Sequence, residues 1–153
     1  FYTHFKRKED VISVLAMECY TLLLDDVLSS AAGTFAKLRR YLVHSARIIE
    51  KNTLQIAQNW AKSVAAPIAG ELCGVEKFNF DRRNIASILE GGVSRGELLP
   101  DTPCEALADS IMEGYYGAVF VWCLTSGETP LERALESFCE TILQPILARY
   151  TNT

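Results

Sequence analysis

Residues 102–149 read TPCEALADSIMEGYYGAVFVWCLTSGETPLERALESFCETILQPILAR. At 102–105 and again at 129–132, a Thr-Pro-x-Glu sequence precedes a run of apolar residues at helical spacing. This is a capping-box pattern, and its proline is pre-organised for the first helical position. The stretch therefore predicts two long helices, over 103–125 and 130–149.

Apolar residues that recur every three or four positions predict four further helices upstream, and no segment alternates with period two for long enough to predict a strand. The predicted ranges are 8–28, 34–51, 52–69 and 81–94. Asn52 and Gln55 resemble a cap pair for the third of these helices. Pro145 should kink the last helix, because its ring removes one backbone hydrogen bond. A chain of 153 residues can bury its own core, so the expected fold class is all-α, a multi-helix bundle.

Composition and charge exclude several classes of protein. The chain is 49% apolar and 22% charged, an ordinary globular balance. It has no apolar run of ~18 residues to span a membrane, and its first ten residues do not resemble a secretory signal. The net charge of −4 argues against nucleic-acid binding by the bulk of the chain. Five cysteines without a Cys-x-x-Cys pair argue against disulfides and zinc, so Cys19, Cys123 and Cys139 are expected as buried thiols.

No residue pattern supports catalysis. The Gly-x-Ser-x-Gly sequence at 92–96 matches a nucleophile elbow, but it ends a predicted helix instead of following a strand. Both histidines, His4 and His44, lie upstream of that serine, and two histidines are too few for a typical metal triad. No phosphate-binding or dinucleotide-binding glycine loop is present. We therefore expect a protein that is not an enzyme and that has no metal and no cofactor.

The last two helices have broad apolar faces. Two such helices side by side at the C-terminal end favour a surface for self-association. The alternative is that the chain's own core buries them. The residues expected at the interface of a homodimer are Phe120, Leu124, Leu131, Leu135, Phe138, Ile142 and Ile146.

Large side chains on the central helices favour a ligand pocket, with simple core packing as the alternative. Ligand sites are mostly apolar with a few polar groups, and the glycines that flank two adjacent tyrosines allow a close approach. The expected lining residues are Trp60, Ile88, Met112, Tyr115 and Tyr116. Glu113 is the charge next to them in sequence. We therefore expect an apolar or aromatic ligand that a phenol hydroxyl orients.

The first eleven residues, FYTHFKRKEDV, resemble the end of the recognition helix and the start of the next helix in the TetR family of bacterial transcriptional regulators. The matching residues are Tyr2, His4, Phe5, Lys8, Glu9, Asp10 and Val11. A second segment, LEGGVSRGEL at 89–98, is similar to the Gly-x-x-x-Gly-Glu-Leu segment that precedes the family's last two helices. A tyrosine hydroxyl, a histidine and a lysine near a helix start are also groups that contact phosphates.

The resemblance implies that 1–7 is the remnant of an N-terminal helix-turn-helix domain and that 8–153 is a helical ligand-binding and dimerisation domain. It implies a homodimer in the bacterial cytoplasm that binds operator DNA through the domain upstream of Phe1, with Tyr2, His4 and Lys8 on phosphates. The function it implies is a ligand-responsive transcriptional regulator, a repressor that a small apolar effector releases from DNA. The alternative is a helical small-molecule-binding or interaction module without DNA function.

Overall fold

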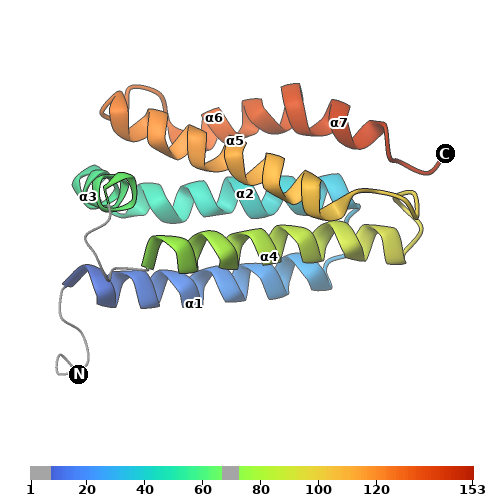
Figure 1. Ribbon diagram of the computed structural model, residues 1–153, viewed down its shortest axis with the longest axis horizontal. Coiled ribbons are helices and arrows are strands. Elements are labelled where there is room, and N and C mark those ends of the chain that lie inside the picture. The colour runs from blue at the N-terminus through green and yellow to red at the C-terminus, as the bar shows by residue number, and fades with distance from the viewer. Residues whose placement is uncertain (1–7, 67–72) are drawn as a thin grey trace.

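Helices make up most of the chain that the structure describes (Figure 1). The computed structural model describes the backbone of residues 8–66 and 73–153, and the side chains of residues 17–66 and 75–153. The helices are α1 (Lys8–Ser29), α2 (Thr34–Lys51), α3 (Leu54–Ala65), α4 (Cys73–Ser94), α5 (Cys104–Leu124) and α6 (Leu131–Phe138), which continues into the π-helical η2 (Cys139–Leu143) and α7 (Gln144–Ala148). Within these ranges the one β-pairing is an isolated bridge between Leu98 and Thr151. The predicted all-α multi-helix bundle is confirmed.

The bundle is built around α2, which packs against α1, α4 and α6, while α5 packs against α3, α4 and α6 (Figure 1). In the view of Figure 1, α3 is seen almost end-on, across the direction of the long helices. The interior combines aliphatic side chains with three tyrosines. The largest fully buried side chains are Tyr20, Tyr41, Tyr115, Leu38, Leu42, Ile85, Ile88, Leu89, Met112, Leu131, Leu135 and Leu143.

Two predicted helix boundaries were wrong. The helix predicted to begin at residue 81 begins at Cys73, so Asp81 lies within α4 instead of at its start. The third helix has Thr53 as its N-cap, where the Thr53 side chain accepts a hydrogen bond from the backbone N–H of Ile56. The earlier start of α4 is consistent with its packing on α1 and α5, whereas the start of α3 is set by the local Thr53 cap.

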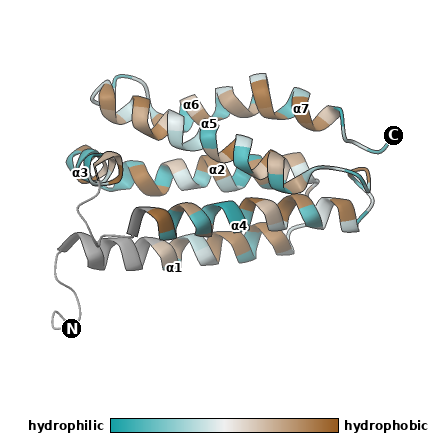
Figure 2. Cartoon of the chain, viewed as in Figure 1, coloured by the Kyte–Doolittle hydropathy of each residue, from teal (hydrophilic) through white to brown (hydrophobic). Residues whose placement is uncertain are grey.

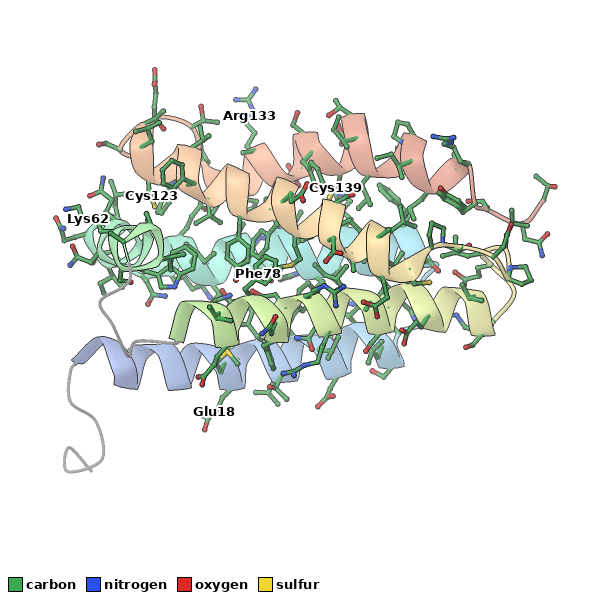
Figure 3. All side chains as sticks on the ribbon, viewed as in Figure 1. Glu18, Lys62, Phe78, Cys123, Arg133 and Cys139 are labelled. Atoms are coloured by element: carbon green, nitrogen blue, oxygen red, sulfur yellow. The ribbon has the colours of Figure 1, made fainter. Side chains whose placement is uncertain are left out.

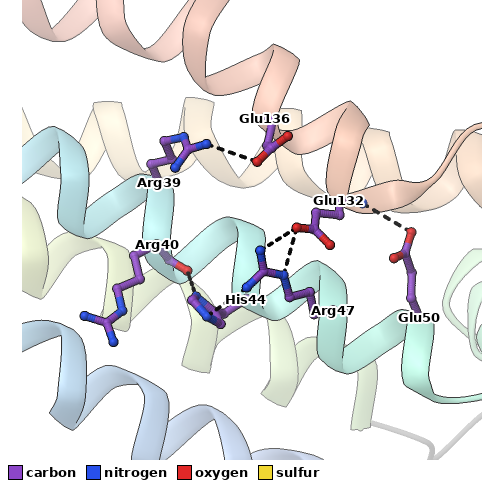
Figure 4. Close-up of polar contacts among 7 residues, drawn as sticks. All are labelled: Arg39, Arg40, His44, Arg47, Glu50, Glu132 and Glu136. Atoms are coloured by element: carbon purple, nitrogen blue, oxygen red, sulfur yellow. Dashed lines mark hydrogen bonds and ion pairs between the residues drawn. The ribbon is translucent and has the colours of Figure 1, made fainter.

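Neither predicted capping box forms. The residues at the N-caps of α5 and α6 are Pro103 and Pro130, and neither makes a side-chain cap. At α6 the backbone N–H groups of Leu131 and Glu132 donate to the carboxylate of Glu50 on α2. Figure 4 shows the bond from Glu132. A carboxylate from a neighbouring helix therefore replaces the local cap and favours the positive end of the helix dipole.

Ion pairs on the same face join α2 to α6. Arg39 donates to Glu136 at 3.0 Å, and the Nε of Arg47 donates to Glu132 at 2.8 Å (Figure 4). These side chains are all partly exposed. Exposed ion pairs each add little to the free energy of unfolding. These pairs do require one particular face of α6 to lie against α2.

The proline in the last helix is accommodated by a π-helical turn. Pro145 has no backbone N–H, and the five residues Cys139–Leu143 before it form η2. The N–H of Gln144 bonds to the carbonyl of Cys139, five residues back. The sequence predicted a kink at Pro145, and the structure has a wider, π-helical turn just ahead of the proline.

The glycine-rich segment at 91–96 ends α4, as predicted, with Gly96 at a φ of +74°. Glu97 follows it and caps α2, whose N-cap residue is Gly33. The backbone N–H and the hydroxyl of Thr34 both donate to Glu97, at 2.8 and 2.6 Å. Arg95 also donates to Glu97, at 2.8 Å. The hydrogen bonds from Arg95 and Thr34 lower the pKa of Glu97 from 4.5 to about 2.

Replacing Glu97 by Gln should flatten the acid side of the stability profile. Because the pKa of Glu97 is lower in the folded state, its ionised carboxylate adds to the free energy of unfolding. This stabilisation is fully present above the ordinary pKa of 4.5 and is lost as the pH falls towards 2. Thermal melting of the wild type and of Glu97→Gln between neutral pH and acid should therefore converge at low pH. Glu90→Gln, at an exposed position on α4, is the control and should keep the wild-type profile. Parallel profiles for Glu97→Gln and the wild type would contradict this role.

Candidate functional site

A fully buried carboxylate lies in the middle of the bundle. Asp81 on α4 has no exposed surface, and three side chains donate to it. The hydroxyl of Tyr41 on α2 donates to its Oδ1 at 2.9 Å, and the hydroxyl of Tyr116 on α5 donates to its Oδ2 at 3.0 Å. The ammonium of Lys77 donates to the same Oδ2 at 2.6 Å. Donors from three helices therefore compensate one buried negative charge, as such a charge requires.

The ammonium of Lys77 is surrounded by aromatic rings. Its Nζ lies 4.3 Å from the ring centroid of Tyr20, 5.8 Å from that of Tyr116 and 6.0 Å from that of Tyr115. Ring faces at such distances attract a cation. We call the four residues around this ammonium, Tyr20, Tyr115, Tyr116 and Asp81, the cation cage. Its members come from α1, α4 and α5, so the site exists only when the bundle is assembled.

Further side chains contact the residues of the cation cage and of Asp81's hydrogen-bond network. Asn84 donates to the hydroxyl of Tyr41 at 3.0 Å, which fixes the phenol that bonds Asp81. The ring of Tyr116 stacks on Trp60 and on Phe78, with centroids 5.6 and 5.4 Å apart. Figure 3 shows Phe78 inside the bundle, whereas Glu18 and Arg133 point outwards. Trp60 and Phe78 are only partly buried, so this aromatic wall runs from the cage towards the surface.

The phenols of the site remain neutral hydrogen-bond donors. Burial raises the pKa of Tyr41, Tyr116 and Tyr20 far above its ordinary value, and the negative charge of Asp81 raises it further. Burial likewise raises the pKa of Tyr115. The buried hydroxyl of Tyr115 has no hydrogen-bond partner among the described residues. The cage therefore holds a donor that is free to bond something else.

A fixed carboxylate, aromatic faces and neutral phenols are groups that can select a ligand by charge and shape. Among residues whose side chains the structure describes, no group of three or more His, Cys, Asp or Glu could hold a metal ion.

The structure brings together three of the five residues predicted to line the pocket. Trp60, Tyr115 and Tyr116 form one aromatic group, with the two tyrosine rings 5.3 Å apart. Ile88 and Met112 are fully buried parts of the hydrophobic core. Glu113, the charge next to them in sequence, is exposed.

The sequence interpretation missed the charged centre itself. Lys77, Asp81 and Asn84 are spaced i, i+4 and i+7 and therefore share one face of α4. Figure 2 shows hydrophilic residues interrupting the hydrophobic ones along this helix. The signal was hidden because the predicted helix began at Asp81, which placed Lys77 outside it.

The predicted homodimer interface is partly corrected. Leu131 and Leu135 are fully buried in the chain's own core, so they cannot face a partner. Phe138 and Ile146 are half-buried, and the Phe138 ring covers Gly114. Large apolar side chains remain exposed on η2 (Ile142) and on α5, where Phe120, Val121 and Leu124 share one face that we call the apolar surface. Leu131, Leu135 and Cys139 are buried on the side of this helix that packs into the bundle, where α6 contacts α2. Ile142, on another side, stays exposed.

The remaining sequence predictions have mixed outcomes. Tyr2 and His4 lie outside the described residues, and of Lys8 only the backbone at the start of α1 is described.

Cys123 and Cys139 are buried as expected, and burial raises the pKa of Cys139 to about 11. Cys19 is exposed, contrary to expectation, because it lies on the outer side of α1 next to the buried Tyr20.

Comparisons with protein-family models, with curated proteins and with solved structures gave no match for this chain. Within the described ranges, the helices are too short or too polar to cross a bilayer.

Two tyrosine variants test the hydrogen-bond network. Tyr41→Phe removes the donor to Asp81 and the acceptor of Asn84, and should lower the free energy of unfolding by ~1–3 kcal/mol. Tyr115→Phe removes an equally buried hydroxyl that has no partner among described residues, so it should be nearly neutral. Urea denaturation measures both. Equal losses for the two variants would show that Asp81 does not depend on Tyr41.

Proposed function

We propose that this chain is the ligand-binding and dimerisation part of a ligand-responsive transcriptional regulator of the TetR type, a repressor that a small effector releases from operator DNA in the bacterial cytoplasm. The observation that carries the proposal is the resemblance of residues 1–11 to the end of that family's DNA-binding domain. Two features support it. An all-helical bundle follows this segment directly, and the bundle holds a polar and aromatic centre suited to a small ligand.

The arrangement offers a physical route from ligand to DNA. α1 follows the segment that resembles the recognition helix, and its Tyr20 is a wall of the cation cage. A ligand that alters the contact between Lys77 and Tyr20 would change how α1 packs on α4. A small rotation of α1 would move the DNA-binding heads, so that the ligand favours a spacing that no longer fits adjacent major grooves.

The apolar surface supports a second copy of this chain as partner. Leu124 is 71% exposed, and Phe120 and Val121 are each about half exposed on the same face of α5. Exposed apolar groups that cluster in this way are typical of an interaction surface. A two-fold axis through α5 and η2 would bury each patch against its own copy and bring two DNA-binding heads to one side.

Leu124→Glu should convert a dimer into a monomer. The substitution places an unpaired charge in the proposed interface, while its exposure in the single chain means that folding is little affected. Light scattering at micromolar concentration should give the dimer mass for the wild type and the monomer mass for the variant. Leu22→Glu, at a position 69% exposed on α1, is the matched control and should remain a dimer. A monomeric wild type would overturn the proposed interface.

The DNA function is tested with the gene that encodes this chain. A helix-turn-helix of ~45 residues encoded directly upstream of Phe1 would support it. In the protein that includes that region, Lys8→Ala should weaken operator binding about equally across sequences and lower the salt slope by roughly one, because Lys8 is assigned to a phosphate. Lys51→Ala, at the far end of α2, is the control. An altered base preference with an unchanged slope would contradict the assignment, and the absence of a helix-turn-helix would favour a binding module without DNA function.

A further inference from the structure

We propose that the cation cage binds an organic ammonium cation, which takes the place of the Lys77 ammonium beside Asp81. This inference rests on the proposed function in one respect, namely that the cage is the effector site. It names the chemical class of the effector as a cation with an apolar or aromatic body, and so adds a positive charge to the apolar or aromatic ligand expected from the sequence.

The first argument is charge balance. Asp81 is fully buried and needs a positive partner, which Lys77 supplies. The Lys77 side chain is 20% exposed, and its flexible stem allows the ammonium to swing into water. Exchanging the lysine ammonium for that of a ligand keeps the interior neutral, whereas an anionic ligand would confront the buried carboxylate. The chain's own lysine thus occupies the position that the ligand's charge would take.

The second argument is the nature of the walls. Tyr20, Tyr115 and Tyr116 present rings to this ammonium at 4.3 to 6.0 Å. Rings around a cation are the arrangement that recognises quaternary ammonium groups. Such a group has no N–H to donate, and Asp81 does not need one from it, since the hydroxyls of Tyr41 and Tyr116 already bond its two oxygens.

Two further features define the rest of the ligand. The partly buried rings of Trp60 and Phe78 continue the wall through Tyr116, and would cover an apolar or aromatic body. The buried hydroxyl of Tyr115, which has no partner among described residues, offers a hydrogen bond to an oxygen on the ligand. Displacing Lys77 also breaks its contact with Tyr20, so occupation of the cage would loosen α4 from α1.

Calorimetric titration of the whole 153-residue chain tests the proposal with three probes. Choline and benzyltrimethylammonium carry the cation, and 3,3-dimethylbutan-1-ol is the uncharged analogue of choline with the same shape. We expect both cations to bind and the alcohol to bind at least tenfold more weakly. Equal binding of choline and the alcohol, or no binding of either cation to the wild type and to the Lys77→Met variant, would overturn the proposal.

The variants separate a binding role from a structural one. Lys77→Met removes the competing ammonium and should tighten binding of both cations about tenfold, while Lys51→Met, at an exposed position, should leave it unchanged. Asp81→Asn should weaken cation binding at least tenfold. If Asp81→Asn does not fold, thermal melting of Lys77→Met tests the binding role instead. Either cation should raise the melting temperature of Lys77→Met more than that of the wild type. A Lys77→Met variant that is merely less stable and gains no affinity would return Lys77 to a structural role.

Failure here and failure of the proposed function are distinguishable. Cation binding is measured without DNA, so it can hold even when no helix-turn-helix lies upstream of Phe1. Conversely, a dimeric chain with that upstream domain but without cation binding would remain a regulator whose effector belongs to another class.

Discussion

The interior of this bundle depends on the buried carboxylate of Asp81. A carboxylate without solvent is costly unless it is both paired and hydrogen-bonded. Its partners, Tyr41, Lys77 and Tyr116, come from α2, α4 and α5. Each of these helices must therefore be oriented about its axis so that its donor reaches the carboxylate of Asp81. The same requirement draws an ammonium and several aromatic rings together, so the element that constrains the fold also creates the chemistry of the cation cage.

Two other carboxylates show how strongly tertiary contacts decide the helix ends. Glu97 caps α2 from 63 residues away, and Glu50 reaches from α2 to the start of α6, 81 residues along the chain. Glu97 thus fixes the start of α2, and α2, through Glu50, fixes the start of α6. Because α2 also packs against α1 and α4, the central helix is fixed along its length, and changes at the cage are more easily taken up by α1.

The apolar surface and the cation cage share α5. Tyr115 and Tyr116 belong to the cage, and Phe120 and Leu124 follow one and two turns later on the exposed side. One helix therefore carries both walls of the cage and the surface where a second copy is proposed to bind.

The sequence by itself determined that the chain is a bundle of helices, where most of them lie, and which end carries the broadest apolar faces. These properties follow from residue spacing and from proline and glycine, which act locally. Of the five residues that the sequence predicted to line a pocket, the structure joins Trp60, Tyr115 and Tyr116 in one aromatic group. Only the tertiary structure decided that Leu131 and Leu135 face inwards, that Glu50 replaces a local cap, and that Lys77 and Asp81 form the polar centre. Each of these depends on how helices distant in sequence pack together, and local periodicity carries no information about which neighbour a helix face will meet.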